Sequence, residues 1–167
     1  MTPRRSLPHW TLLRHPIHFL TLGLGSGLSP WAPGTAGTLV AWFLWPLLAH
    51  QMASATLLGW LVAATLFGFW ACGITARALG AKDPGAIVWD EMVATWWVLF
   101  FLPPTLAAQS AGVLLFRCFD VAKPWPITAV EAKLSGGLGI IVDDLAAAAL
   151  TLFVLAVASH YHLLPVG

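Results

Sequence analysis

Residues 15–76 of this chain contain no Lys, Arg, Asp or Glu. A membrane-crossing helix needs about 20 apolar residues, so a charge-free stretch of this length must turn back on itself. Charged residues make up 9% of the 167-residue sequence, against about 25% in soluble domains. With 59% hydrophobic residues and a mean hydropathy of +0.81, the sequence favours a compact protein embedded in lipid.

The length predicts one domain, residues 1–167, that begins with a polar segment at 1–15. The net charge of +1 offers no basic field to a phosphate backbone, which argues against nucleic acid as a partner. Nothing in the composition sets an oligomeric state.

Apolar segments separated by polar or Gly/Pro-rich turns predict an all-α, multi-pass membrane protein of about four to five hydrophobic helices. A Gly/Pro-rich segment at Gly23–Gly37, expected to be a loop or a re-entrant element, precedes them. The expected helices are Thr38–His50, Thr56–Ala76, Ala86–Leu102, Thr105–Phe119 and one from about Ile141 to His160.

The basic residues predict the orientation. If the helices alternate in direction, every Lys and Arg falls on one side of the membrane, which the positive-inside rule makes cytoplasmic. These residues are Arg4, Arg5, Arg14, Arg77, Lys82, Arg117, Lys123 and Lys133.

Five of the seven acidic residues lie in or at the ends of apolar helices, whereas Asp83 and Glu131 lie in polar loops. An ionised carboxylate at the centre of a spanning helix costs roughly 2.5–3.5 kcal/mol, so such acids indicate a functional site. The predicted topology brings them to one membrane face, with the last pair at the start of the final helix. The five are Asp90, Glu91, Asp120, Asp143 and Asp144.

A cluster of carboxylate oxygens is typical of a Mg²⁺ site, and all five acids are candidate ligands. Arg117 lies beside Asp120 on one helix and, with Lys123, is a candidate phosphate contact. A simpler interpretation, in which Arg117 only pairs with Asp120 and the other acids cap helices, stays open. Asp90, Asp143 and Asp144 are the candidate catalytic acids, and Asp144 is the candidate general base.

The Gly/Pro-rich loop is a second candidate anion site. Gly34, Thr35 and Thr38 lie where a helix is expected to begin, at Thr35 or Thr38, and backbone amides at a helix start bind anions. Glycines also serve close helix packing in membranes, so this signal depends on whether the loop meets the acids.

Several chemistries are disfavoured. Neither Cys72 nor Cys118 has an Arg at the spacing of a thiol-based phosphatase, and Cys/His spacing for zinc is absent from the sequence. The six histidines lie away from the acids. A phosphatase of this sequence is therefore expected to use metal-activated water.

Four motifs, in order, resemble the phosphatidylglycerophosphatase A family: Gly25-Ser-Gly-Leu-Ser-Pro with Pro33-Gly-Thr-x-Gly37, Ile87-Val-Trp-Asp-Glu91, Phe116-Arg-x-x-Asp-x-x-Lys-Pro-Trp-Pro-Ile127, and Gly136-Gly-x-Gly-Ile with Asp143-Asp144. The resemblance implies a Mg²⁺-dependent protein of the bacterial inner membrane that converts phosphatidylglycerophosphate to phosphatidylglycerol. It also implies metal and catalytic roles for the five acids, and phosphate contacts from Arg117, Lys123 and the Gly34-Thr35 loop.

Two alternatives remain. An ion- or proton-coupled membrane carrier would also need intramembrane carboxylates, although it predicts them near the bilayer midplane rather than near helix ends. A phosphatase acting on another lipid phosphate would share the composition and the acid cluster.

Overall fold

The computed structural model describes residues 9–81, 84–125, 127–128, 134 and 136–161. This part of the chain is helical, without strands, which confirms the predicted all-α class. In chain order its helices are α1 (His9–Leu12), α2 (Pro16–Thr21), the 3-10 helix η1 (Gly23–Leu28), α3 (Pro33–Gln51), α4 (Ser54–Leu79), α5 (Trp89–Phe101), α6 (Leu106–Ala122) and α8 (Gly136–His160).

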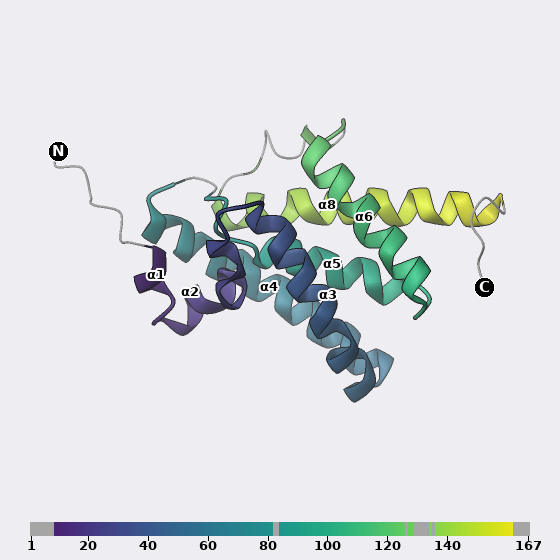
Figure 1. Cartoon of the computed structure of the whole chain (residues 1–167), viewed down its shortest axis with the longest axis horizontal. Helices are drawn as coiled ribbons and strands as arrows, with labels where there is room; N and C mark the ends of the chain where they lie inside the picture. Colours follow the sequence, from purple (N-terminus) through teal and green to yellow (C-terminus); the bar gives the residue numbers. More distant parts are fainter. Residues whose placement is uncertain (1–8, 82–83, 126, 129–133, 135, 162–167) are drawn as a thin grey trace.

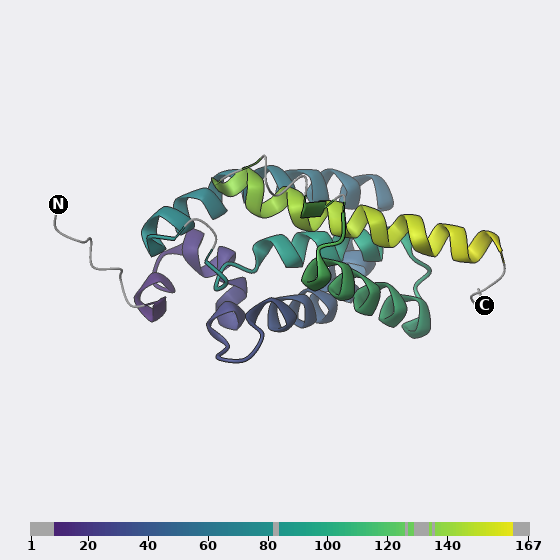
Figure 2. The ribbon, with the colours of Figure 1, turned by 90° about the horizontal axis from the view of Figure 1, so that it is seen from above.

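Helix α5 lies at the centre, packed against α3, α4, α6 and α8 (Figure 1). Seen from above, α4 and α8 lie on one side of it, and α3 and α6 lie on the other (Figure 2). The successive residues Val93, Ala94 and Thr95 all have no exposed surface. Because successive helical residues are about 100° apart, the middle of α5 is buried on every side.

A tight turn joins α5 to α6. The Pro103-Pro104 pair follows the end of α5, and the Thr105 side chain then caps α6 by accepting a hydrogen bond from the Ala108 N–H. The two helices pack against each other. The start of α5 therefore lies beside the end of α6.

Three predicted helix starts are wrong, and one of them is Ala86, because α5 begins at Trp89. Helix α3 begins at Pro33, because proline suits the first helical position, and Ala32 before it takes a left-handed conformation with φ of 44°. Helix α8 begins at Gly136 rather than Ile141, because its glycines lie in a helix crossing and not in a loop. A Cβ on Gly137 would lie 2.1 Å from the Phe69 carbonyl oxygen of α4.

The N-terminal part contains the short helices α1 and α2, which the sequence did not predict. Residues 1–8 of the expected polar segment lie outside the described residues, as do Lys82, Asp83, Glu131 and Lys133. The buried Thr75 hydroxyl on α4 lies 2.8 Å from both His18 Nδ1 and Thr21 Oγ1, which ties α2 to α4.

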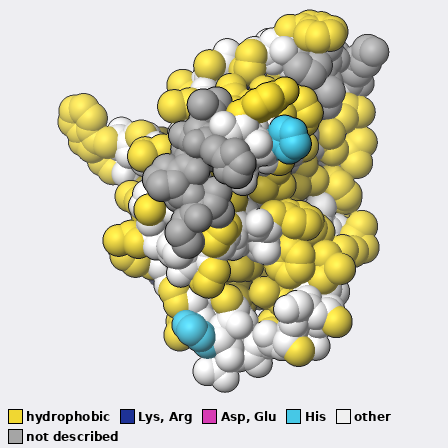
Figure 3. Space-filling model, turned by 90° about the vertical axis from the view of Figure 1, so that its right-hand side faces the viewer, with side chains coloured by type: hydrophobic (Ala, Val, Ile, Leu, Met, Phe, Trp, Pro, Cys, Tyr) yellow, Lys and Arg dark blue, Asp and Glu magenta, His cyan; other side chains and the backbone are white. Residues whose placement is uncertain are grey.

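The exterior is strongly apolar. Helices α4 and α8 are long and apolar enough to cross a membrane. The end of the molecule where α8 terminates is covered mainly by hydrophobic side chains, and no described Lys, Arg, Asp or Glu is visible on that face (Figure 3). Large hydrophobic residues that are more than half exposed include Phe43, Leu47, Phe101, Leu106, Leu114 and Phe153.

Gly137→Ala is expected to destabilise the protein, because the added methyl meets the backbone of α4 at Phe69 and Gly73, which cannot rotate away. Overpacking of about 1–3 kcal/mol corresponds to a fall in Tm of roughly 3–10 °C, measurable by thermal unfolding in detergent. Gly59→Ala in α4 is the control, since a Cβ there meets nothing within 4 Å. Equal Tm values for the two variants would contradict the close α4–α8 crossing.

Candidate active site

Three carboxylates meet at the start of α5. One oxygen from each of Asp90, Glu91 and Asp144 lies within 4.8 Å of the others. Asp90 is 8% exposed and Asp144 is 4% exposed. In the described part of the chain, Asp90 Oδ1, Glu91 Oε2 and Asp144 Oδ2 are buried without a hydrogen-bond partner. Two buried acids and one partly buried acid, each with an unsatisfied oxygen, form a site suited to a cation.

Local structure explains how these acids meet. Asp90 and Glu91 occupy the first turn of α5, where the helix dipole favours negative charge. Asp144 comes from α8, about 12 Å along the helix axis from its first residue Gly136. The prediction that the second acid pair begins its helix is therefore wrong, and the reason is the early start of α8.

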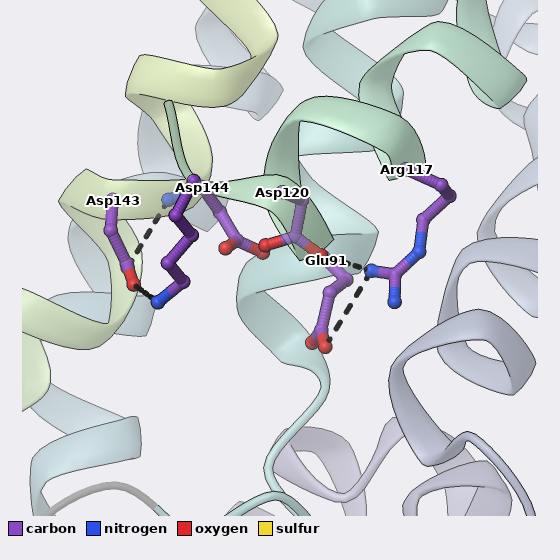
Figure 4. A network of polar contacts seen from close by, with 6 residues as sticks. Glu91, Arg117, Asp120, Asp143 and Asp144 are labelled. Carbon is purple, nitrogen blue, oxygen red and sulfur yellow. Dashed lines mark hydrogen bonds and ion pairs between the residues drawn. The ribbon is translucent and has the colours of Figure 1, made fainter. Parts of the chain in front are cut away.

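Arg117 connects this acidic triad (Asp90, Glu91 and Asp144) to Asp120. Its Nη1 donates a hydrogen bond to Asp120 Oδ2 on the same helix and lies 3.8 Å from Glu91 Oε1 (Figure 4). Its Nε is buried without a partner among the described residues. The carboxyl groups of Asp120 and Asp144 point toward each other (Figure 4). Arg117 thus lies at the site with a donor available to an anion.

Asp143 lies next to Asp144 in sequence but faces a different partner. Lys123 Nζ donates a hydrogen bond of 2.8 Å to Asp143 Oδ2, and the Asp144 N–H donates one of 3.1 Å to Asp143 Oδ1 (Figure 4). Sequence reasoning missed this ion pair, because its members are 20 positions apart and nothing local couples them.

The N-terminus of α3 completes the site. A Cβ on Gly34 would lie 2.2 Å from Glu91 Oε1 and 3.0 Å from Arg117 Nη2, so only glycine fits there without displacing these groups. The first turn of α3 has no side-chain cap, which leaves amide donors for an anion. The Gly/Pro-rich segment therefore does meet the acids, which is the condition on which its candidacy as an anion site depends.

The other two residues predicted on this segment lie differently. Thr35 is exposed in the first turn of α3, whereas Thr38 is 1% exposed, one turn further along. The Thr38 hydroxyl has no partner among the described residues, and neither does that of Thr95 on α5. Sequence reasoning missed Thr95, although its position four residues after Glu91 places both on one helix face.

Comparisons with known proteins fit this site. Residues 19–159 match the family model of phosphatidylglycerophosphatase A. The chain is 38% identical to phosphatidylglycerophosphatase A of Escherichia coli, over 89% of this chain and 87% of that protein. It is also 38% identical to the phosphatidylglycerophosphatase A of Haemophilus influenzae, over 98% of this chain and 100% of that protein.

A third relative has a different name. A putative phosphatidylinositol-3-phosphatase of Bacteroides thetaiotaomicron is 38% identical, over 81% of this chain and 89% of that protein. No solved structure gives a significant match.

The helical fold, the buried acids beside Arg117 and these relatives define an enzyme, a phosphatase that acts on a phosphomonoester. The chain belongs to the phosphatidylglycerophosphatase A family. The enzyme is thereby favoured over the membrane carrier that the sequence left open.

Gly34→Ala is expected to lower phosphatase kcat/KM at least about tenfold, because the methyl displaces the Glu91 carboxylate and the Arg117 guanidinium from their present positions. The Tm is expected to stay near that of the unmodified protein, since both groups are the ends of flexible side chains. Gly59→Ala again serves as the control. Full activity of Gly34→Ala would show that this close approach does not matter to the reaction.

Proposed function

We propose that the protein is a Mg²⁺-dependent lipid phosphatase that hydrolyses the terminal phosphomonoester of phosphatidylglycerophosphate to give phosphatidylglycerol. The names of the Escherichia coli and Haemophilus influenzae relatives support the substrate. The observation that carries the chemistry is the meeting of Asp90, Glu91 and Asp144 next to Arg117 and the N-terminus of α3.

Asp90, Glu91 and Asp144 are the proposed Mg²⁺ ligands. Each has one buried oxygen without a partner in the described part of the chain, and mutual repulsion makes a cation favourable there. The donors are all oxygens, which suits Mg²⁺ and disfavours zinc. When bound, Mg²⁺ would polarise the phosphoryl group and lower the pKa of an attacking water.

The phosphate is proposed to bind between Arg117 and the first turn of α3. Arg117 offers Nε, and the α3 turn offers the amides at Gly34 and Thr35. Lys123 adds a second cation at the edge of the site. These fixed donors stabilise charge that develops on the phosphoryl oxygens.

Asp144 is the proposed general base. Its carboxyl group belongs to the acidic triad and also points toward that of Asp120 (Figure 4). In this role one of its carboxylate oxygens accepts the proton of the attacking water, next to the Arg117–Asp120 pair.

A multi-pass position in the bacterial inner membrane, with the site facing the cytoplasm, is also part of the proposal. The apolar exterior and the two long apolar helices support the membrane, and the distribution of Lys and Arg supports the orientation. The phosphate would then meet the site at the headgroup level.

Detergent-purified protein is expected to release phosphate from phosphatidylglycerophosphate with Mg²⁺ and not with EDTA. Asp90→Asn is expected to lower the rate by at least about a hundredfold, because it removes a proposed metal ligand. Asp83→Asn is the matched control, since Asp83 is not one of the proposed ligands and the substitution makes the same chemical change. Release that is indifferent to EDTA would rule out the metal.

Hydrolysis of another lipid phosphate is a second candidate, favoured by the relative named as a putative phosphatidylinositol-3-phosphatase. Rates on phosphatidylglycerophosphate, phosphatidylinositol 3-phosphate and phosphatidic acid, each in mixed micelles with Mg²⁺, separate the two. We expect the highest kcat/KM with phosphatidylglycerophosphate. A higher kcat/KM with either of the other two lipids would show that this lipid is the preferred substrate.

A further inference from the structure

The two adjacent acids of α8 have different environments. Both oxygens of Asp143 accept hydrogen bonds, one from Lys123 Nζ and one from the Asp144 N–H. Asp144 instead joins the acidic triad and keeps Oδ2 without a partner in the described part of the chain. Since their side chains leave the helix about 100° apart, neighbouring acids can serve two different purposes.

Lys123 has an unusual backbone conformation. Lys123 follows the last residue of α6 with φ of 40° and ψ of 59°, a left-handed conformation that is uncommon for residues other than glycine. Its N–H donates to the Phe119 carbonyl oxygen at 2.8 Å, and Pro124 follows, so the helix cannot continue. Such local strain costs about 1–3 kcal/mol and is concentrated at functional positions.

The ion pair lies at the edge of the site rather than in the core. The Lys123 side chain is 27% exposed, whereas that of Asp143 is 7% exposed. A lysine side chain with solvent access samples many rotamers unless a partner holds it. The buried carboxylate is therefore the fixed member of the pair, and the ammonium is the member that it orients.

We propose that Asp143 is a positioning residue, which holds the Lys123 ammonium at the acidic site so that it contacts the substrate phosphate. In this proposal Asp143 orients the lysine, and Asp144 binds the metal. The inference rests on the proposed function, because it takes a phosphate as the ligand. The Arg117–Asp120 pair on the opposite side of the triad is built in the same way, with a carboxylate orienting a cation.

Binding measurements on the full-length protein in detergent test the assignment without turnover. Asp143→Asn is expected to bind Mn²⁺, followed by electron paramagnetic resonance, within about twofold of the unmodified protein, whereas Asp144→Asn loses this binding. Inorganic phosphate affinity, measured by calorimetry with Mg²⁺ present, is expected to fall about tenfold in Asp143→Asn. Loss of Mn²⁺ binding in Asp143→Asn would overturn the proposal and make Asp143 a metal ligand.

A double-mutant cycle tests whether Asp143 acts through Lys123. Lys123→Met is expected to weaken phosphate binding as much as Asp143→Asn or more, and the double variant is expected to equal Lys123→Met alone. For turnover, the expected effect is a raised KM with a smaller change in kcat. Additive losses in the double variant would show that Asp143 does not act through the lysine.

A charge swap separates positioning from stabilisation. The variant carrying Lys123→Asp and Asp143→Lys keeps an ion pair but places the negative charge at the edge of the site. Its Tm is expected to exceed that of Lys123→Asp alone, while its phosphate affinity stays low. Recovery of phosphate affinity along with Tm would show that the pair is only structural and overturn the proposal.

These measurements also distinguish a failure of the proposed substrate from a failure of the proposed role of Asp143. If the unmodified protein binds Mn²⁺ and phosphate but releases no phosphate from phosphatidylglycerophosphate, the proposed substrate is wrong. The role of Asp143 is still decided by the binding measurements and the double-mutant cycle.

Discussion

The burial of two adjacent acids in the first turn of α5 is the constraint on which the rest of the structure depends. Helix α5 packs against α3, α4, α6 and α8, so Asp90 is buried and the Glu91 side chain is only 14% exposed. Buried carboxylates need partners or a cation to offset their lost hydration. Arg117 from α6, the α3 N-terminus beside Gly34 and Asp144 from α8 all converge on this point.

Two glycines allow the close contacts that position the site. At Gly34 the missing side chain admits Glu91 and Arg117, and at Gly137 it admits the backbone of α4. The first contact shapes the site directly. The second sets the position of α8 along α4. That position determines where the Asp144 side chain meets Asp90 and Glu91. Small residues thus allow close helix packing in this fold and also align acids from separate helices.

The sequence predicted much of this arrangement, because burying an acid in an apolar helix is costly enough to be informative on its own. The helix order and the meeting of Asp90, Glu91 and Asp144 follow from that cost and from the alternating helix direction. The start of α8 was not predictable, since Gly136 and Gly137 read equally well as a loop until their contact with α4 is known. The Lys123–Asp143 pair likewise depends on how α6 and α8 pack.

The two acid pairs, one on α5 and one on α8, are arranged in the same way. In each pair the inner member, Asp90 or Asp144, belongs to the acidic triad, and the outer member, Glu91 or Asp143, faces a cation, Arg117 or Lys123 respectively. The proposed metal and the proposed phosphate place opposing charge requirements on one site. A purely acidic cluster would repel the phosphate, and a neutralised one would not hold the metal. Placing the cations on the outer members of each pair satisfies both requirements, because attraction falls with distance and is stronger in a buried site.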